Sequence, residues 1–446
     1  MEKSRSILSQ WIKNIGFKVL TLTLTFSSLS LLAQIKSGPM LGYKALREVA
    51  VWVQMDSSME VRFTYHPKGD AANFQSKSQI SNPEKANTLT FIASGLDVGS
   101  TYEYKLVDAN YKLLDKGEFS TQEQWQYRKD PPNFSFLIGS CTYVNDTAYD
   151  RPGEPYGKGL EIFSAMLEKD AEAMLWLGDN IYLRPADWDS RSGIYYRYSH
   201  YKSQPALQEF WKNFHHYAIW DDHDYGPNDA NRSFVNKDIT LEAFKDFWAN
   251  PNYGLNSNAE GITGMFSYND VDFFLLDNRS FRTPNERESG ERFILGDEQI
   301  AWLIDALVSS KARFKIVAVG GQLLNTAALY ENHSTFAEER QKIIELIEEE
   351  QIKNVVFLSG DRHKTELSKY VGENDFTIYD FTSSPLSSTS YNSIEEPNTL
   401  RVEGTHYGEQ NFGMLTFEGS WKERVLVLQT FDKNGELIWT HKIKAK

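Results

Sequence analysis

The sequence predicts an α/β protein in which a small all-β domain precedes a larger domain with a sheet layered between helices. Two patterns indicate this arrangement: short runs of alternating polarity up to about residue 121, and strands alternating with helical segments from residue 134 onward. A third observation concerns function, because three apolar runs of the second part end in acidic and histidine residues. Ligands in open α/β sheets bind beyond the carboxyl ends of such strands.

Residues 1–33 have the layout of a secretory signal peptide. Four basic residues precede an apolar stretch from Val19 to Leu32, and Ala33 precedes the expected cleavage site. The alternative is a retained membrane anchor, but this stretch is shorter than the roughly 20 residues that a spanning helix needs. We therefore expect an exported protein, periplasmic or extracellular, with no stable membrane insertion after cleavage.

The charge of the chain limits its partners. The formal net charge is −14, and it becomes −17 when residues 1–33, with four basic groups and one acidic group, are removed. A surface this acidic repels polyanions, so we expect no bulk nucleic-acid binding. Bound metal ions would still attract a single phosphate group.

Cys141 is the only cysteine of the chain, so no internal disulfide can form. In an exported protein a single thiol links two chains, stays buried and inert, or acts chemically. Its place at the end of the predicted strand Leu137-Ile-Gly-Ser-Cys141, beside the other strand ends, favours a chemical role.

Residues 38–125 are predicted to form a small β-sandwich. The stretch from Leu96 to Tyr104 resembles the turn and tyrosine strand of fibronectin type III domains. The two prolines of the segment 129–133 break both helix and sheet, which indicates a linker to the next domain. The expected strands begin near residues 49, 59, 88 and 101.

The second domain, residues 133–446, is predicted to alternate strands with helices. Strands are expected at residues 134–138, 173–177, 272–277, 314–319 and 354–358. Helices are expected at residues 157–169, 204–214, 240–248, 297–308 and 336–349. Near the C-terminus, Asn434-Gly435 predicts the turn of a β-hairpin.

Carboxylates and histidines gather at three of the strand ends. Asp179, Asp222 and Asp361 follow apolar runs, and His223 and His363 accompany two of them. One Asp-x-His pair would be weak evidence, because buried histidines usually satisfy only hydrogen bonds. Three such clusters predict a metal site, with His223 as a ligand or a general acid.

Three more residues are candidates for the same site. Tyr182 follows Asp179 by three positions; such a tyrosine is ordinarily a packed aromatic, but its phenolate can bind a hard metal ion. Asn228 is a candidate ligand, although turn residues of this kind are usually structural. Arg279, past another strand, is a candidate clamp for a substrate phosphate, against the alternative of a surface ion pair.

Four motifs together resemble those of the alkaline phosphatase D family, a branch of the calcineurin-like metallophosphoesterases. They are Gly-Ser-Cys141, Gly-Asp179-Asn-Ile-Tyr182, Trp-Asp221-Asp222-His223-Asp224 and Gly-Asp361-Arg-His363. The resemblance spans roughly residue 38 to the C-terminus. It implies a four-layer αββα catalytic domain preceded by a small fibronectin-III- or Ig-like β domain.

The resemblance also implies a multimetal site, often with iron and calcium. Carried over motif by motif, the iron-like centre would be held by Cys141, Asp179, Tyr182 and Asp361. The second metal position would be held by, or share, Asp179, Asp222, Asp361 and His363. The ligands that complete its shell stay open, with Asn228 as one candidate.

Two departures from the wider superfamily bear on the metal. Its usual Asp-x-His after the first strand is replaced by Ser140-Cys141, and its Gly-Asn-His by Asp221-Asp222-His223. The added negative charge favours Fe3+ or calcium over a plain dizinc site, with other divalent metals possible.

The expected function is hydrolysis of a small phosphomonoester, in which a metal-activated hydroxide attacks phosphorus in line. The catalytic residues would be His223, as proton donor, with Asp222 and Arg279. A phosphodiesterase or phospholipase-D-like hydrolase that uses the same metals is an open alternative, because only the shape of the pocket separates the two. The third hypothesis is a catalytically inactive secreted binding protein. Such a protein would have lost acidic or histidine groups at the strand ends, and this chain retains them.

Overall fold

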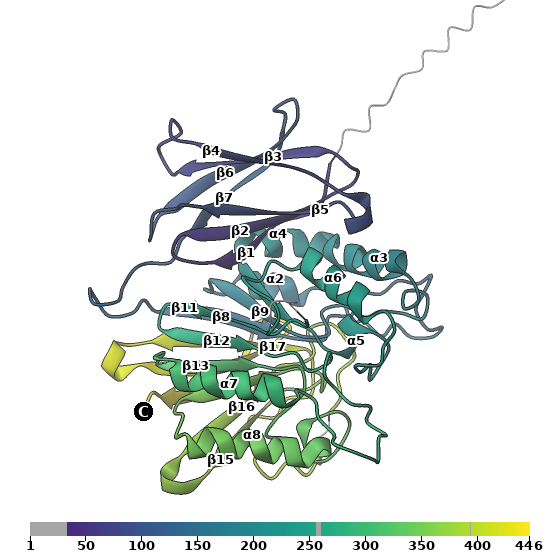
Figure 1. Ribbon diagram of the computed structural model, residues 1–446, viewed down its shortest axis with the longest axis vertical. Coiled ribbons are helices and arrows are strands. Elements are labelled where there is room, and N and C mark those ends of the chain that lie inside the picture. The colour runs from purple at the N-terminus through teal and green to yellow at the C-terminus, as the bar shows by residue number, and fades with distance from the viewer. Residues whose placement is uncertain (1–33, 256–259, 393) are drawn as a thin grey trace, which may run out of the picture. The chain divides into compact units, whose positions relative to one another are not determined.

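The computed structural model describes residues 34–255, 260–392 and 394–446 (Figure 1). The predicted signal peptide, residues 1–33, lies outside the described residues. Within them, no helix combines the length and the apolar character that crossing a membrane requires.

The described strands form three sheets. The largest, in spatial order, contains β19 (Leu437–Lys444), β18 (Val425–Asp432), β17 (Asn411–Glu418), β8 (Phe134–Gly139), β9 (Ala173–Leu177), β10 (His215–Ile219), β1 (Ile35–Lys44), β2 (Glu48–Met55) and β5 (Thr88–Ser94). The second contains β11 (Gly264–Tyr268), β12 (Val271–Leu275), β13 (Phe314–Ala318), β14 (Val355–Ser359), β16 (Thr377–Thr382) and β15 (Glu366–Val371). The third contains β4 (Gln75–Ile80), β3 (Glu60–Pro67), β6 (Thr101–Asp108) and β7 (Leu113–Ser120).

The two larger sheets pack face to face through aromatic side chains. The ring of Phe136 on β8 stacks on Phe273 on β12 with centroids 4.8 Å apart, and Tyr217 on β10 stacks on Phe266 on β11 at 3.9 Å. All four residues are at most 9% exposed. Burial of aromatic surface of this size is the main force that holds such layers together.

Helices cover the outer faces of both sheets (Figure 1). The larger sheet is covered by α2 (Ile162–Leu167), α3 (Arg191–Lys202), α4 (Pro205–Asn213) and α6 (Lys237–Phe247), whose buried side chains join its core. The six-stranded sheet is covered by α7 (Asp297–Ser309) and α8 (Ala337–Glu349). The result is the four-layer αββα arrangement, and this prediction is confirmed.

A β-sandwich at the N-terminal end is also confirmed, but it shares a sheet with the rest of the protein. Its second layer is the four-stranded sheet, and Phe63 on β3 stacks on Phe91 on β5 across the core. Its first layer, β1, β2 and β5, continues the nine-stranded sheet, because β1 pairs parallel to β10. The domain ranges 38–125 and 133–446 therefore stay predictions, since one sheet runs through both.

Most predicted helices and strands are present, with α2 shorter than expected, and α3 is the clearest omission. Its buried face is formed largely by tyrosines, and its mean hydropathy is low. Tyr195, Tyr198 and Tyr201 recur at intervals of three, which places them on one helical face. Because tyrosine is less apolar than leucine or isoleucine, this face gives only a weak hydrophobic pattern, and no helix was predicted here.

Lys202 at the end of α3 is buried without an ion pair among the described residues. Its Nζ lies 3.2 Å from the ring centroid of Trp248, 4.2 Å from that of Trp211, and 3.2 Å from Sδ of Met40. Burial holds the pKa of Lys202 well below the ordinary lysine value. The folded protein therefore binds the proton of Lys202 less tightly than the unfolded chain does.

We expect Lys202→Met to raise the free energy of unfolding at pH 7 by about 1–3 kcal/mol, because methionine fills the site without a desolvation cost. Between the lowered folded pKa and about 10.5, the unfolded state binds a proton that the folded state lacks. Wild-type stability therefore rises with pH in this window, and the gain of the variant should shrink toward pH 10. Urea unfolding at pH 7 and pH 9.5 tests this, with the surface variant Lys342→Met as control. A gain that does not change with pH contradicts the explanation.

Candidate metal centre

Four strands deliver the predicted residues to one place. In the nine-stranded sheet β8, β9 and β10 run parallel, so their carboxyl ends share one edge. Cys141 follows β8, Asp179 follows β9, and Asp222 and His223 follow β10 in the short helix α5 (Asp222–Tyr225). Asp361 and His363 follow β14 of the facing sheet.

These groups open onto a cavity of about 950 Å³. The predicted residues that line it are Asp179, Asp222, His223, Asn228, Asp361 and His363. Cys141 and Tyr182 are buried behind its wall, in contact with Asp179. Arg279 does not line the cavity.

The backbone at this edge is held in an uncommon conformation. Cys141, Asp179, Asp361 and His363 have φ of 60°, 49°, 63° and 49°, in the left-handed region that L residues rarely occupy. Gly178, directly before Asp179, has φ 94°, and a Cβ there would lie 2.7 Å from Cβ of Asp221. Strain of this kind clusters at functional sites, where surrounding contacts impose it.

The first cluster of ligand atoms contains Cys141, Asp179 and His363, which lie within 4.8 Å of one another. Sγ of Cys141 lies 3.6 Å from Oδ2 of Asp179, and the hydroxyl of Tyr182 donates to the same oxygen at 3.1 Å. That hydroxyl also lies 3.2 Å from Nε2 of His363. Sulfur, carboxylate, phenol and imidazole thus converge on one point.

Three more clusters share members with the first. Asp179, Asp222 and His223 form one, and Asp221, Asp222 and Asp361 form another. The last contains Asp222, Asp229 and Glu331. Because Asp179 and Asp222 each belong to more than one cluster, neighbouring ion positions could share them as bridging ligands.

The crowded, buried carboxylates of the site favour the binding of cations. Burial and the surrounding carboxylates, Asp222 and Asp221 above all, raise the pKa of Asp179 well above its ordinary value. Burial and the same two neighbours raise the pKa of Asp361. In addition, the buried atoms Oδ2 of Asp221 and Oδ1 of Asp222 have no hydrogen-bond partner. Bound cations would neutralise the repulsion between these carboxylates and give the two oxygens a partner. The oxygen-rich donor set suits hard ions.

Asp224 holds two of the strand-end loops together. Its buried carboxylate accepts hydrogen bonds from the backbone N–H groups of Asn180 at 3.1 Å and Asp221 at 3.0 Å. Burial raises the pKa of Asp224 to about 8, although these N–H donors act in the opposite direction. Asp224, the last acidic residue of the Asp221–Asp224 motif, is therefore a positioning group.

Arg279 has a different place from the one expected. The guanidinium is 1% exposed; its Nε donates to Oδ1 of Asp221 at 2.6 Å and its Nη2 to Glu331 at 2.8 Å. Nη1 donates to the carbonyl of Ala230 at 3.2 Å. Because these contacts keep Arg279 behind the cavity wall, the geometry argues against a direct clamp on phosphate. It favours a group that positions Asp221 and Glu331.

Two carboxylates of the site, Asp229 and Glu331, were not predicted from the sequence. Asp229 is exposed on the cavity wall next to the predicted Asn228, and its backbone N–H donates to Oδ2 of Asp222 at 2.7 Å. Glu331 is buried in a loop after β13. Neither follows a strand directly, so the pattern of apolar runs with acidic ends could not reveal them.

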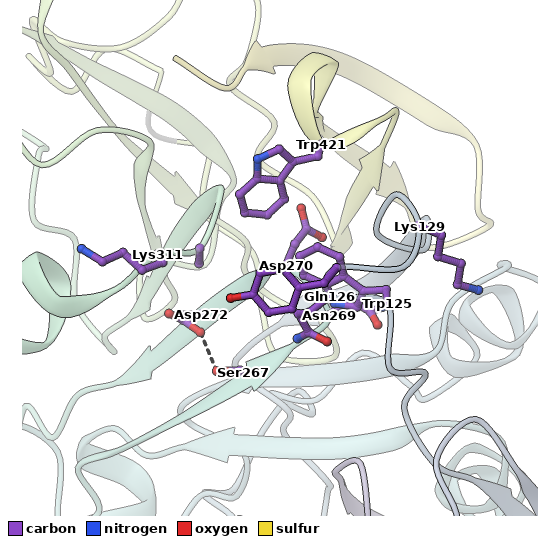
Figure 2. Close-up of a pocket in the computed structure, with 11 residues that line it drawn as sticks. Trp125, Gln126, Lys129, Ser267, Asn269, Asp270, Asp272, Lys311 and Trp421 are labelled. Carbon is purple, nitrogen blue, oxygen red and sulfur yellow. Dashed lines mark hydrogen bonds between the residues drawn. The ribbon is translucent and has the colours of Figure 1, made fainter.

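A second cavity, of about 580 Å³, lies near the amino ends of β12 and β13 (Figure 2). Trp125 and Trp421 line it with ring centroids 5.4 Å apart, and Asp272 is tied to Ser267 there by a 2.6 Å hydrogen bond. Its lining residues belong to none of the metal-ligand clusters in the described part of the chain. The chemistry of the strand ends is therefore confined to the larger cavity.

Comparison with known proteins identifies the family. The model of the PhoD-like phosphatase family matches residues 136–420, a range that includes all four strand-end motifs. Alkaline phosphatase D of Bacillus subtilis (strain 168) is 22% identical over 334 residues, which cover 64% of this chain and 55% of that protein. The chain thus spans about half the length of this curated relative. A solved structure of PhoD shares the fold, with a TM-score of 0.73, 16% identity and 91% of each chain covered. The chain belongs to the PhoD-like phosphatase family.

Proposed function

We propose that this protein is an exported, metal-dependent hydrolase of phosphoric esters that acts on a small phosphomonoester. The observation that carries the proposal is the set of four clusters of ligand atoms around one cavity. A cavity with this many carboxylates would repel a phosphate unless cations neutralised it. Family membership supports the phosphoesterase reaction, and the layout of residues 1–33 supports export.

The residues divide naturally between two ion positions. The family resemblance assigns Asp361 to the iron position and His363 to the second position. We instead assign iron, as Fe3+, to Cys141, Asp179 and Tyr182 with His363, because this cluster brings the thiol, the phenol and the imidazole together. Calcium would be held by Asp222 and its carboxylate neighbours, which offer oxygen alone. When bound, the ions would polarise the phosphoryl oxygens and activate the attacking water.

His223 is the proposed proton donor to the leaving group. Its ring lies 4.3 Å from the ring of Tyr182, which fixes its orientation, and Nε2 lies 4.0 Å from Oδ2 of Asp222. Its Nδ1 is buried without a partner, and the side chain lines the cavity. A histidine held this way, with 21% of its side chain exposed, can reach a substrate oxygen.

A phosphodiesterase that uses the same groups is the second candidate, because a cavity of about 950 Å³ has room for a second ester substituent. The two candidates separate in one experiment on the protein from Gln34 onward, purified with iron and calcium supplied. We expect kcat/KM for p-nitrophenyl phosphate to exceed that for bis-p-nitrophenyl phosphate. The opposite order would move the assignment to the diesterase. If the metal-loaded protein turned over neither ester, the inactive binding protein would become the better explanation.

A further inference from the structure

The cavity at the strand ends is much larger than a phosphate group requires. Its volume is about 950 Å³. This lies at the upper end of the range of about 300–1,000 Å³ for pockets that enclose a whole organic ligand. The strand-end groups occupy one part of the lining, so the rest is free to contact the non-phosphate part of a substrate.

That remaining part of the lining carries exposed apolar and aromatic side chains. Leu329, Tyr330, Tyr391 and Ile394 are 43%, 77%, 51% and 58% exposed, and all four line this cavity. They belong to 17 large hydrophobic side chains that are exposed in the described part of the protein. Gathering of four of them around one cavity is the pattern of a ligand site rather than of scattered surface residues.

The two aromatic rings, those of Tyr330 and Tyr391, contact residues of the segment that follows β14. Tyr391 stacks on His363 with centroids 5.3 Å apart and an interplanar angle of 20°, and its N–H donates to the carbonyl of His363 at 2.9 Å. The guanidinium of Arg362 lies 4.8 Å from the ring of Tyr330, and Glu396 holds this guanidinium at 2.7 Å. Both rings are thus held in place by residues next to Asp361, which lowers the entropic cost of stacking a ligand on them.

Polar side chains that line the same cavity favour a heterocycle over a plain phenyl ring as the bound group. The side chain of Asn392, an amide that can donate and accept, is exposed and lines the same cavity as the two tyrosines. Amide side chains pair with the edges of nucleobases, and aromatic side chains stack on their faces. Glu395 is also exposed and lines the cavity, and its carboxylate would repel a second phosphate.

We propose that Tyr330, Tyr391 and Asn392, here called the nucleobase wall, bind the nucleobase of a nucleoside monophosphate. This inference rests on the proposed function, because the phosphate of the same ligand would reach the strand-end groups. The ligand is a single nucleotide, which is compatible with the expected lack of bulk nucleic-acid binding. Stacking recognises any base, so the wall selects for the presence of a base more than for its identity.

The test compares 5′-AMP with ribose 5-phosphate as substrates of the metal-loaded protein. Both release phosphate from the same primary alcohol, so the intrinsic reactivity of the ester is equal and only the base differs. We expect kcat/KM for 5′-AMP to be higher by roughly 5- to 100-fold, mainly through a lower KM. Adenosine binding to the metal-free protein, followed by NMR saturation transfer, provides a readout that needs neither metal nor turnover.

Tyr330→Asn removes one ring while suiting the positive φ of 54° at that position. This variant should reduce the ratio of the two kcat/KM values and weaken adenosine binding. The control Tyr127→Ala, at an exposed tyrosine that lines the other cavity, should change neither.

The outcomes separate the two proposals. Equal kcat/KM values for the two substrates in wild type, or an equal loss of both in Tyr330→Asn, would overturn the nucleobase wall while the phosphatase stood. If neither ester were hydrolysed but adenosine bound and Tyr330→Asn abolished the binding, the wall would stand and the phosphomonoesterase would fall. Absence of adenosine binding together with a 5′-AMP preference that Tyr330→Asn leaves intact would also overturn the wall.

Discussion

Replacing Asp361 by asparagine should lower kcat/KM for a phosphate ester by about a thousandfold or more, with a parallel loss of bound metal. Asp361 is the acidic member of the β14 strand end and belongs to the cluster with Asp221 and Asp222. Loss of one charged ligand removes several kcal/mol of stabilisation of the charge that develops on the phosphoryl group, and each 1.36 kcal/mol is about tenfold in rate. Elemental analysis and kinetics on one preparation measure both effects.

The effect of Asp361→Asn on Tm, relative to the wild type, should change sign when the metals are removed. In a chelated protein, burial and the neighbours Asp221 and Asp222 raise the pKa of Asp361, so its charge destabilises the fold. Because the folded state then binds a proton more tightly than the unfolded state, this cost grows as pH rises above the ordinary aspartate value. Asp361→Asn should therefore raise Tm in chelator at pH 8 and lower it when metals are supplied.

A matched control is available at Asp375. This residue is exposed, is absent from the metal-ligand clusters, and has a φ of 60°, close to the 63° of Asp361. Asp375→Asn should leave metal content, activity and both Tm values unchanged. If Asp361→Asn lowered Tm equally with and without metal, Asp361 would have only a structural role.

Replacing His223 by alanine should lower kcat for an alkyl phosphate by about two to four orders of magnitude, which is the usual contribution of a proton donor. The loss should be smaller for p-nitrophenyl phosphate, because its leaving group departs without protonation. Steady-state kinetics with glycerol 3-phosphate and p-nitrophenyl phosphate reveal this difference.

The size of the two losses separates the roles of His223. Equal losses would indicate that it steadies the phosphoryl group in the transition state rather than donating a proton. A fall in metal content would indicate a ligand, since His223 shares a cluster with Asp179 and Asp222. His200→Ala, at a histidine outside the cavity, serves as control. An undiminished kcat in His223→Ala would remove this histidine from the mechanism.

The order of strands and helices was largely predictable, and so was the edge at which the site forms. Apolar runs that end at Asp179, Asp222 and Asp361 are visible in the sequence because a strand buried on both faces leaves little room for polar residues until it ends. Parallel pairing of β9 with β10 brings the ends at Asp179 and Asp222 together, and Asp361 joins them from β14 of the facing sheet. This rule located most of the acidic site without further information.

The remaining features depend on contacts between distant segments. Pairing of β1 with β10 joins Leu41 to His215, and nothing local in either strand records that partner. Glu331 reaches the site from an irregular loop, so no periodic pattern marks it. The burial of Arg279 between Asp221 and Glu331 follows from the same loop, which is why its expected contact with phosphate was not supported.

Metal dependence is tested by following activity and metal content together during removal and return of the metals. The protein from Gln34 onward would be assayed with p-nitrophenyl phosphate as purified, after chelation and dialysis, and after addition of iron and calcium. Activity should fall in proportion to metal content and return with it, while circular dichroism shows that the folded state persists. Full activity in a protein shown to contain no metal would contradict the central claim that the carboxylates around this cavity act through bound cations.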